Sequence, residues 1–315
     1  MIKINRRRFV TNAAASAAGL LMGNSVIGFA SKEQSLIAGT EVPKESLMKK
    51  VMKYPKIDSH AHIHIGAEND PDRVLYYADK LGINKLMISR PITSLSEATP
   101  ENFRKVNDLV IKCMKQHPDR FTGMVVFNAR YQKESLEEID RCVDAGMVGA
   151  GELYRQVKIN DPLYYPIIEK FIDLKMIIMQ HSIGIAGYSR VKRYPSSEPK
   201  SGSLPEDFVD IVKRYPEAMF QYAHIGGGID WENACKILKD SPNVYVDVSG
   251  SNNVANMIDF AMKYIGEDRL LFGCDNCFYQ GVGHMLSAKL TNAQRRKIFF
   301  DNYNNILKKS GNNLN

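Results

Sequence analysis

Histidines and carboxylates recur at one kind of position in this sequence, directly after short apolar segments. His60 and His62 end the first such segment. Because residues i and i+2 of a strand point to the same side, these two imidazoles can share one metal ion. Four residues of the same chemistry follow later apolar segments: Glu152, His181, His224 and Asp275. The recurrence predicts one shared polar site, although Glu152 taken alone could instead bind a loop amide or an arginine.

The apolar segments alternate with amphipathic stretches of helical period, a pattern typical of βα units around a parallel sheet. We expect eight strands: Lys56–Ser59, Lys85–Ser89, Gly123–Asn128, Val148–Glu152, Met176–Gln180, Met219–Ala223, Val244–Val248 and Leu270–Gly273. This predicts an α/β protein with a (β/α)₈ TIM barrel, whose active site lies at the carboxyl ends of its strands. A doubly wound open sheet is the alternative, but it usually has a glycine-rich turn where this chain has histidines.

The motif Asp58-Ser59-His60-Ala61-His62, followed in order by His181, His224 and Asp275, resembles the amidohydrolase superfamily, specifically its amidohydrolase-related (amidohydrolase 2) branch. The resemblance covers nearly all of the chain after residue 55. It implies a metal-dependent enzyme whose metal ligands are His60, His62, His181 and Asp275. For His224 it implies either a ligand role towards a second metal or an acid/base role.

One departure from the superfamily concerns the end of strand four. Many members have a carboxylated lysine there that bridges two metals, but this chain has Glu152 and no lysine before Lys158. Glu152 is therefore a candidate metal ligand, and we expect one ion, or two bridged by Glu152. Imidazole and carboxylate ligands without thiolates suit Zn²⁺, with Mn²⁺ or Fe²⁺ as alternatives.

The chemistry expected of such a site is hydrolysis of an amide, ester or lactone. A divalent ion with an open position lowers the pKa of bound water to roughly 7 and polarises a carbonyl. Asp275 would act as general base and then general acid, and His224 would stabilise the developing oxyanion. Asp58 would orient a metal ligand from behind.

Two other activities and one non-catalytic role remain open. The same branch includes aminocarboxymuconate-semialdehyde-type decarboxylases, which resemble this chain in the two-histidine, histidine and aspartate pattern and use one zinc. It also includes metal-free lactonases. A binding protein on the same barrel has no need of an acid/base group, so the retained histidines and carboxylates argue against that role.

Arginines follow three other predicted strands: Arg90, Arg130 and Arg155. Because an arginine fork matches carboxylate and phosphate groups, these residues are candidates for binding a small anionic substrate. Solvated arginines are also common in the surface loops of barrels. Residues 184–204, rich in Gly, Ser and Pro, form a long segment that we expect to be a substrate lid.

The first thirty residues indicate an export signal. A basic start with the twin arginines of Asn5-Arg6-Arg7-Arg8 precedes an alanine-rich apolar stretch and the small-residue pattern Gly28-Phe29-Ala30. The twin arginines resemble the signal read by the twin-arginine export machinery, and an ordinary secretory signal is the alternative. We expect residues 1–30 to be this signal, 31–54 a lead-in segment and 55–315 the barrel, in the periplasm or otherwise exported.

Charge and cysteine content exclude several other classes of protein. The net charge is +7, but four basic residues and no acidic one lie in residues 1–30, so the remainder carries only +3. That balance does not indicate a nucleic-acid partner, and no later segment reaches the ~20 apolar residues of a membrane anchor. The five cysteines are too few and scattered for a disulfide framework, although Cys274 and Cys277 form a C-x-x-C pair. A homo-oligomer is compatible with the composition.

Overall fold

The computed structural model describes residues 46–64, 70–154, 157–182, 203–225, 231–250, 254 and 256–314. Residues from Leu47 onward form one compact unit. The expected export signal, most of the lead-in segment, nearly all of the expected lid and Arg155 lie outside the described residues. None of the described helices combines the length and apolarity needed to cross a membrane.

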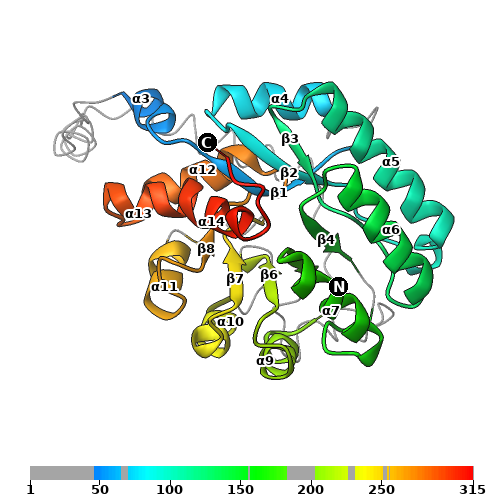
Figure 1. The fold of residues 1–315 in the computed structure, drawn as a ribbon. Helices are drawn as coiled ribbons and strands as arrows, with labels where there is room; N and C mark the ends of the chain where they lie inside the picture. Colours follow the sequence, from blue (N-terminus) through cyan, green and yellow to red (C-terminus); the bar gives the residue numbers. More distant parts are fainter. Residues whose placement is uncertain are drawn as a thin grey trace, which may run out of the picture. The chain divides into compact units, whose positions relative to one another are not determined.

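Among the described residues, eight strands, all paired in parallel, form the centre of the unit (Figure 1). They are β1 Ile57–His62, β2 Lys85–Ser89, β3 Phe121–Gly123, β4 Gly149–Leu153, β5 Ile177–His181, β6 Met219–Ala223, β7 Val244–Asp247 and β8 Leu270–Leu271. They pair in the orders β1-β2-β3 and β4-β5-β6-β7-β8. The amide of Val125 donates to the carbonyl of Gly149 (2.8 Å), and that of Ser59 to Phe272 (2.9 Å), which joins the two groups at both edges. The expected α/β class is confirmed, and these bonds close the strands into a barrel.

Helices surround the strands in an outer layer (Figure 1). The α-helices are α3 Leu47–Met52, α4 Pro71–Lys80, α5 Pro100–Gln116, α6 Gln132–Asp144, α7 Tyr165–Leu174, α9 Pro205–Arg214, α10 Trp231–Ile237, α11 Met257–Tyr264, α12 Phe278–Ser287, α13 Asn292–Arg296 and α14 Asn302–Lys309. Short 3₁₀ turns are η1 Leu95–Glu97, η2 Pro162–Tyr164 and η4 Leu238–Asp240, and η5 Lys297–Asp301 is π-helical. Several starts follow from the sequence: at α5, the Thr99 hydroxyl accepts from the amide of Asn102 and Pro100 needs no amide partner.

Successive side chains along each strand point alternately into the barrel and towards the surrounding helices. This alternation forms two hydrophobic clusters and directs the site residues inward. In β5, Ile177 and Met179 pack with residues from most other strands in the barrel interior, whereas Ile178 packs against the helices. His181 continues the Ile177–Met179 series, because side chains two residues apart share a face. Its imidazole therefore points into the mouth of the barrel.

Three details differ from the sequence-based expectation. Strand β3 spans Phe121–Gly123, whereas the expected strand began at Gly123 and ran to Asn128. Beyond Gly123 the chain is still hydrogen-bonded to β4, through the amide of Val125. The short helix α3 lies within the expected lead-in segment, and α12 was not expected after strand eight. Helix α12 contains Gly281 and Gly283, and it was not predicted because glycine is a poor helix former.

The amino end of β1 has a buried charged group of its own. Lys56 is fully buried, and its Nζ donates to the backbone carbonyls of Val51 (2.5 Å), Tyr54 (2.9 Å) and Gly82 (3.5 Å). The same Nζ lies 5.0 Å from the centre of the Phe299 ring. Burial lowers the pKa of this amine from 10.5 to about 8. Lys56 thus joins α3 and the start of β2 to the base of the barrel.

Candidate metal centre

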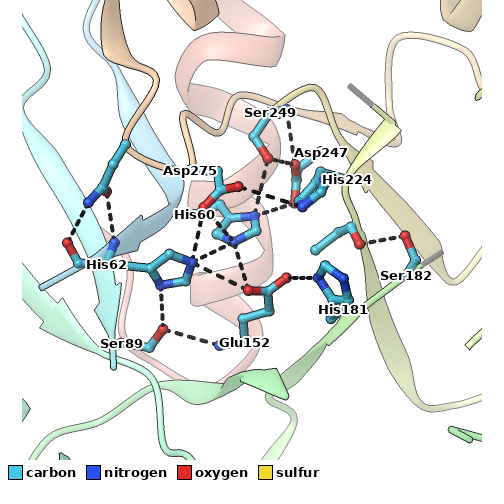
Figure 2. A network of polar contacts seen from close by, with 12 residues as sticks. His60, His62, Ser89, Glu152, His181, Ser182, His224, Asp247, Ser249 and Asp275 are labelled. Carbon is cyan, nitrogen blue, oxygen red and sulfur yellow. Dashed lines mark hydrogen bonds and ion pairs between the residues drawn. The ribbon is translucent and has the colours of Figure 1, made fainter. Parts of the chain in front are cut away.

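The six residues that the sequence singled out come together at the carboxyl ends of five strands (Figure 2). His60 and His62 lie on β1, and their Nε2 atoms are 3.1 Å apart. Asp275, in the turn after β8, places Oδ1 3.1 Å from His62 Nε2 and 3.8 Å from His60 Nε2. These three residues form one cluster of potential ligand atoms that all lie within 4.8 Å of one another.

A second cluster lies beside the first and consists of Glu152, His181 and His224. Glu152 Oε1 is 2.6 Å from His181 Nδ1. Its other oxygen, Oε2, is 3.4 Å from His62 Nε2 and 3.6 Å from His60 Nε2, so Glu152 faces both clusters. His224 Nε2 lies 3.6 Å from Asp275 Oδ2, which links the clusters a second time.

Local backbone geometry explains how two of these carboxylates are placed. Gly151, with φ +119°, precedes Glu152, and a Cβ there would lie only 2.2 Å from the carbonyl oxygen of Met179. Only glycine fits that position. Asp275 and Asn276 also have positive φ, 45° and 59°, which is uncommon outside glycine and clusters at functional sites.

Asn276 connects the Asp275 turn to the end of β1. Its side-chain oxygen accepts from the amide of His62 (2.9 Å), and its side-chain nitrogen donates to the carbonyl of the same residue (2.9 Å). The two bonds resemble those that a neighbouring strand would make to His62. Because β8 is only two residues long, the Asn276 amide continues the pairing of β1 where β8 has ended.

The electrostatics of the protein groups suit a cation. Burial alone would raise the pKa of Asp275, but His60, His62 and His224 outweigh it and bring the pKa to about 2. The pKa of Glu152 likewise lies well below its usual value, because His181 and His60 outweigh its burial. Burial lowers the pKa of His224, which keeps that imidazole neutral near pH 7. Two ionised carboxylates therefore face several imidazole nitrogens in a partly buried pocket.

Residues behind the clusters hold the histidines in place, and sequence reasoning found only one of them. Asp58 was expected to orient a ligand, and its Oδ1 accepts from the amides of His60 (3.1 Å) and Cys274 (2.9 Å). Ser89 and Asp247 were missed: Ser89 Oγ lies 3.1 Å from His62 Nδ1, and Asp247 Oδ2 lies 3.1 Å from His60 Nδ1. Asp247 ends β7, so the strand-end rule that found the other carboxylates would have found it too.

The donor set fits a divalent metal. Both Nε2 atoms of the first cluster and an oxygen of each carboxylate aim at a common space, which is how ligands surround an ion (Figure 2). Nitrogen and oxygen donors of this kind suit Zn²⁺, Mn²⁺ or Fe²⁺. Cys274 does not belong to the set, since burial raises the pKa of its thiol well above the usual value and disfavours the thiolate.

The amidohydrolase family model matches residues 57–302, which includes every strand and the whole site. The chain belongs to the amidohydrolase family. Its solved structural neighbours lie in the amidohydrolase-2 branch, which matches the expectation from the His60 and His62 motif. No curated protein sequence matches the chain.

Solved structures similar to this amidohydrolase share its fold at low sequence identity. A 2,6-dihydroxybenzoate decarboxylase from Rhizobium is 17% identical, with a TM-score of 0.64 over 82% of this chain and 100% of that one. A dihydroxybenzoic acid decarboxylase from a Polaromonas species, solved with bound manganese, is 18% identical, with a TM-score of 0.64 over 81% and 97%. A 4-oxalomesaconate hydratase from Rhodopseudomonas palustris is 17% identical, with a TM-score of 0.61 over 81% and 96%.

A cavity of about 720 Å³ opens beside the first cluster of this amidohydrolase. His62 lines it together with His64, Arg90, Glu97 and Lys105. Its size is that of a small-molecule site. Arg90, one of the three predicted substrate-binding arginines, thus lines the same cavity as His62, a candidate metal ligand.

Arg130 is not placed there. Arg130 is exposed in the turn before α6 and is not among the described residues that line this cavity. Arg155 lies in the part of the chain that the structure does not describe.

Proposed function

We propose that this amidohydrolase is a metal-dependent hydrolase that cleaves an amide, ester or lactone of a small anionic substrate. The observation that carries the proposal is the position of Glu152, whose two oxygens face His62 on one side and His181 on the other. A buried carboxylate between two imidazoles is suited to bind a metal ion, and an additional carboxylate ligand at the end of strand four would favour a hydrolase.

Each residue has a distinct task in this proposal. His60, His62, His181, Glu152 and Asp275 would hold one or two divalent ions, which would activate water and polarise a carbonyl. Asp275, ionised and 3.6 Å from His224, takes the proton from the attacking water and passes it to the leaving group. His224, neutral near pH 7, donates to the oxygen on which negative charge develops.

Arg90 gives the proposal its substrate class. The guanidinium is always charged, and it lines the cavity that His62 also lines. A carboxylate on the substrate would bind Arg90 while the scissile carbonyl lies at the metal ligands. Replacing Arg90 with Gln is expected to raise KM about 10- to 100-fold, because a charge-assisted bond contributes roughly 1.5–3 kcal/mol, and to change kcat little.

A decarboxylase is the second candidate, and the solved structures favour it. Several of the similar structures are described as decarboxylases of hydroxylated benzoates, and one of them contains manganese. In that case a substrate carboxylate would bind at the metal, its carbon–carbon bond would break to release carbon dioxide, and a proton would take its place on the remaining carbon. Glu152 would not be needed as a ligand.

The metal content of the purified protein separates these functions. We expect one or two equivalents of zinc or manganese, with a lower content in Glu152→Ala and in Asp275→Ala and no change in a control, Asp240→Asn, whose side chain is 85% exposed. One equivalent that survives the loss of Glu152, with carbon dioxide release from hydroxybenzoates, would favour the decarboxylase. A protein that takes up no metal even after reconstitution would contradict both.

We also propose that residues 1–30 direct export through the twin-arginine machinery and that the mature enzyme works outside the cytoplasm. The support is the sequence alone: Arg6, Arg7 and Arg8 before an apolar, alanine-rich stretch. Expression with Arg6 and Arg7 both replaced by Lys, compared with the parent, tests this by cell fractionation and by the mass of the mature chain. Equal export and processing of both forms would contradict the twin-arginine route.

A further inference from the structure

The carboxylate of Asp247 is buried behind the candidate metal ligands, and its hydrogen bond to that group of residues goes to His60 (Figure 2). Asp247 is fully buried at the end of β7. Its Oδ1 accepts from the amide of Ser249 (3.0 Å) and from the Ser249 hydroxyl (2.5 Å). Its Oδ2 accepts from Gln221 Nε2 (2.9 Å) and lies 3.1 Å from His60 Nδ1.

The partners of Asp247 decide where the proton on His60 must be. A backbone amide and a side-chain NH₂ can only donate, so each carboxylate oxygen accepts at least one hydrogen bond, and these donors favour the ionised form of Asp247. The nitrogen of His60 that faces Oδ2 must then carry hydrogen, and Nδ1 is the donor. Nε2 is left to face His62, Glu152 and Asp275.

We propose that Asp247 is a positioning residue that fixes the orientation and proton arrangement of His60, so that Nε2 is presented to the metal. Gln221 and Ser249 hold the Asp247 carboxylate in the required direction. Gln221 is itself buried and fixed, because its Nε2 also donates to the hydroxyl of Ser59 (3.2 Å). This inference rests on the proposed metal-dependent function of the same site.

The neighbouring histidine has a weaker support, which makes the assignment specific. His62 Nδ1 faces the hydroxyl of Ser89, and that oxygen also accepts from the amide of Glu152 (3.1 Å). A neutral hydroxyl gives a weaker hydrogen bond than a carboxylate does. We therefore expect His60 to be the more basic and more firmly held of the two ligands, and its support to matter more for metal affinity.

Replacement of Asp247 with Asn tests the proposal with almost no change in shape. The Asn NH₂ must face either the Ser249 amide or the pair formed by Gln221 Nε2 and His60 Nδ1, and in both cases donors meet. If it faces His60, it donates to Nδ1 and moves the hydrogen to Nε2, where the metal should bind. Supports of this kind typically change metal affinity 10- to 100-fold, so we expect zinc binding to weaken by roughly that factor.

The experiment measures zinc affinity of the full-length protein by competition with a chromophoric chelator, for the parent and three variants. Asp247→Asn should lose roughly 10- to 100-fold. Zinc affinity should fall less in Ser249→Ala, which keeps the backbone amide donor to Asp247. It should not change in the exposed control Asp240→Asn. A ¹H–¹⁵N spectrum of the imidazoles in zinc-saturated protein, assigned with a His60→Gln variant, should show a protected Nδ1–H on His60 that disappears in Asp247→Asn.

The outcomes separate this inference from the proposed function. If the parent binds zinc and Asp247→Asn binds it equally well with the same protected Nδ1–H, the role of Asp247 is refuted and the metalloenzyme stands. If the parent binds no divalent metal, the proposed function fails and the presentation of Nε2 to a metal fails with it. In that case the imidazole spectrum of the metal-free parent and variant still shows whether Asp247 alone sets the His60 hydrogen. The unfolding midpoint of Asp247→Asn is also measured in chelator, without metal. A midpoint well below that of the parent would show a general loss of stability.

Discussion

Strand β1 has buried ionisable groups at both of its ends, and the two ends differ in what surrounds them. At the amino end, the Lys56 ammonium is bonded to three backbone carbonyls. At the carboxyl end, His60 and His62 face carboxylates that come from β4, β7 and the turn after β8. The first set is complete within the backbone, whereas the second converges on a common space.

The contrast shows that burial of a charge does not by itself indicate function. The Lys56 ammonium donates to backbone carbonyls that the fold already holds in position. The amino end of β1 therefore needs no ligand. At the other end, imidazole nitrogens and carboxylate oxygens converge on one space, an arrangement that a divalent cation would complete. The division agrees with the general behaviour of TIM barrels, whose amino-end residues serve stability and whose carboxyl-end residues serve catalysis.

The largest expected effect is the loss of metal in His60→Ala. We expect its zinc affinity to fall more than about a hundredfold, because a direct ligand contributes more than the supports behind it. Its unfolding midpoint in chelator should also fall, because the buried Asp247 carboxylate loses the imidazole that faces it, so the two losses are measured separately. Zinc competition and thermal unfolding measure the two quantities, and unchanged zinc binding would remove the distinction between the two ends.

Lys56→Met should lose stability but keep its metal. Methionine fills the space but donates nothing, so the Val51 and Tyr54 carbonyls lose their partner and the free energy of unfolding should fall by about 2 kcal/mol. Zinc stoichiometry should remain that of the parent. Denaturant titration measures the free energy of unfolding, and elemental analysis measures the zinc stoichiometry. Loss of metal in Lys56→Met would show that the two ends of β1 are coupled.

Gly273→Ala sharpens the comparison at the carboxyl end. A Cβ there would lie 3.1 Å from His60 Cβ, 3.2 Å from Ser59 Oγ and 3.3 Å from Asp247 Cβ. We expect a destabilisation of about 1–3 kcal/mol together with weaker zinc binding, because the new methyl group pushes on the supports of His60. The matched control is Gly283→Ala in α12, where a Cβ meets no atom within 4 Å. That control should leave zinc binding unchanged and stabilise the helix by up to about 1 kcal/mol.

The smallest expected effect is a pH dependence that belongs to Lys56. Its pKa is about 8 in the folded protein and 10.5 without burial, so between these values the unfolded chain binds more protons than the folded one. Stability from this group therefore rises with pH across that window, by about 1 kcal/mol or more. We expect the free energy of unfolding of the parent to exceed that of Lys56→Met by a growing amount as pH rises from 7 to 10. Denaturant titrations under reducing conditions measure this difference. A constant difference would contradict the assignment.

The sequence was sufficient for the chain order of the strands and for all six residues of the two clusters. Strand-end positions are predictable because parallel strands in a barrel bring their carboxyl ends together, so His60, His181 and Asp275 meet whatever the helices do. Among the supports, Asp247 ends β7 and was predictable by the same rule, whereas Gln221 was not. Gln221 and Ser59 meet only because β6 and β1 face each other across the barrel interior, which no local pattern reveals.

Other expectations were inaccurate for local reasons. The glycines of α12 conceal a helix that forms because its apolar side chains, such as Phe278 and Met285, are buried. Arg130 follows the extended chain after β3, but the chain turns there and leaves its side chain exposed. An arginine at a strand end is thus a weaker indicator of the site than a histidine, since arginine is equally common in solvated turns.

The side chain of Asn276 has a consequence for the engineering of this enzyme. It offers one donor and one acceptor to the peptide groups of His62, and no other residue type except glutamine has both in a planar amide. A library that varies the Asp275 turn to change specificity while keeping β1 fixed will therefore discard most of its members, because each change at 276 also releases His62. Residues 62, 275 and 276 should be transplanted or randomised as one unit.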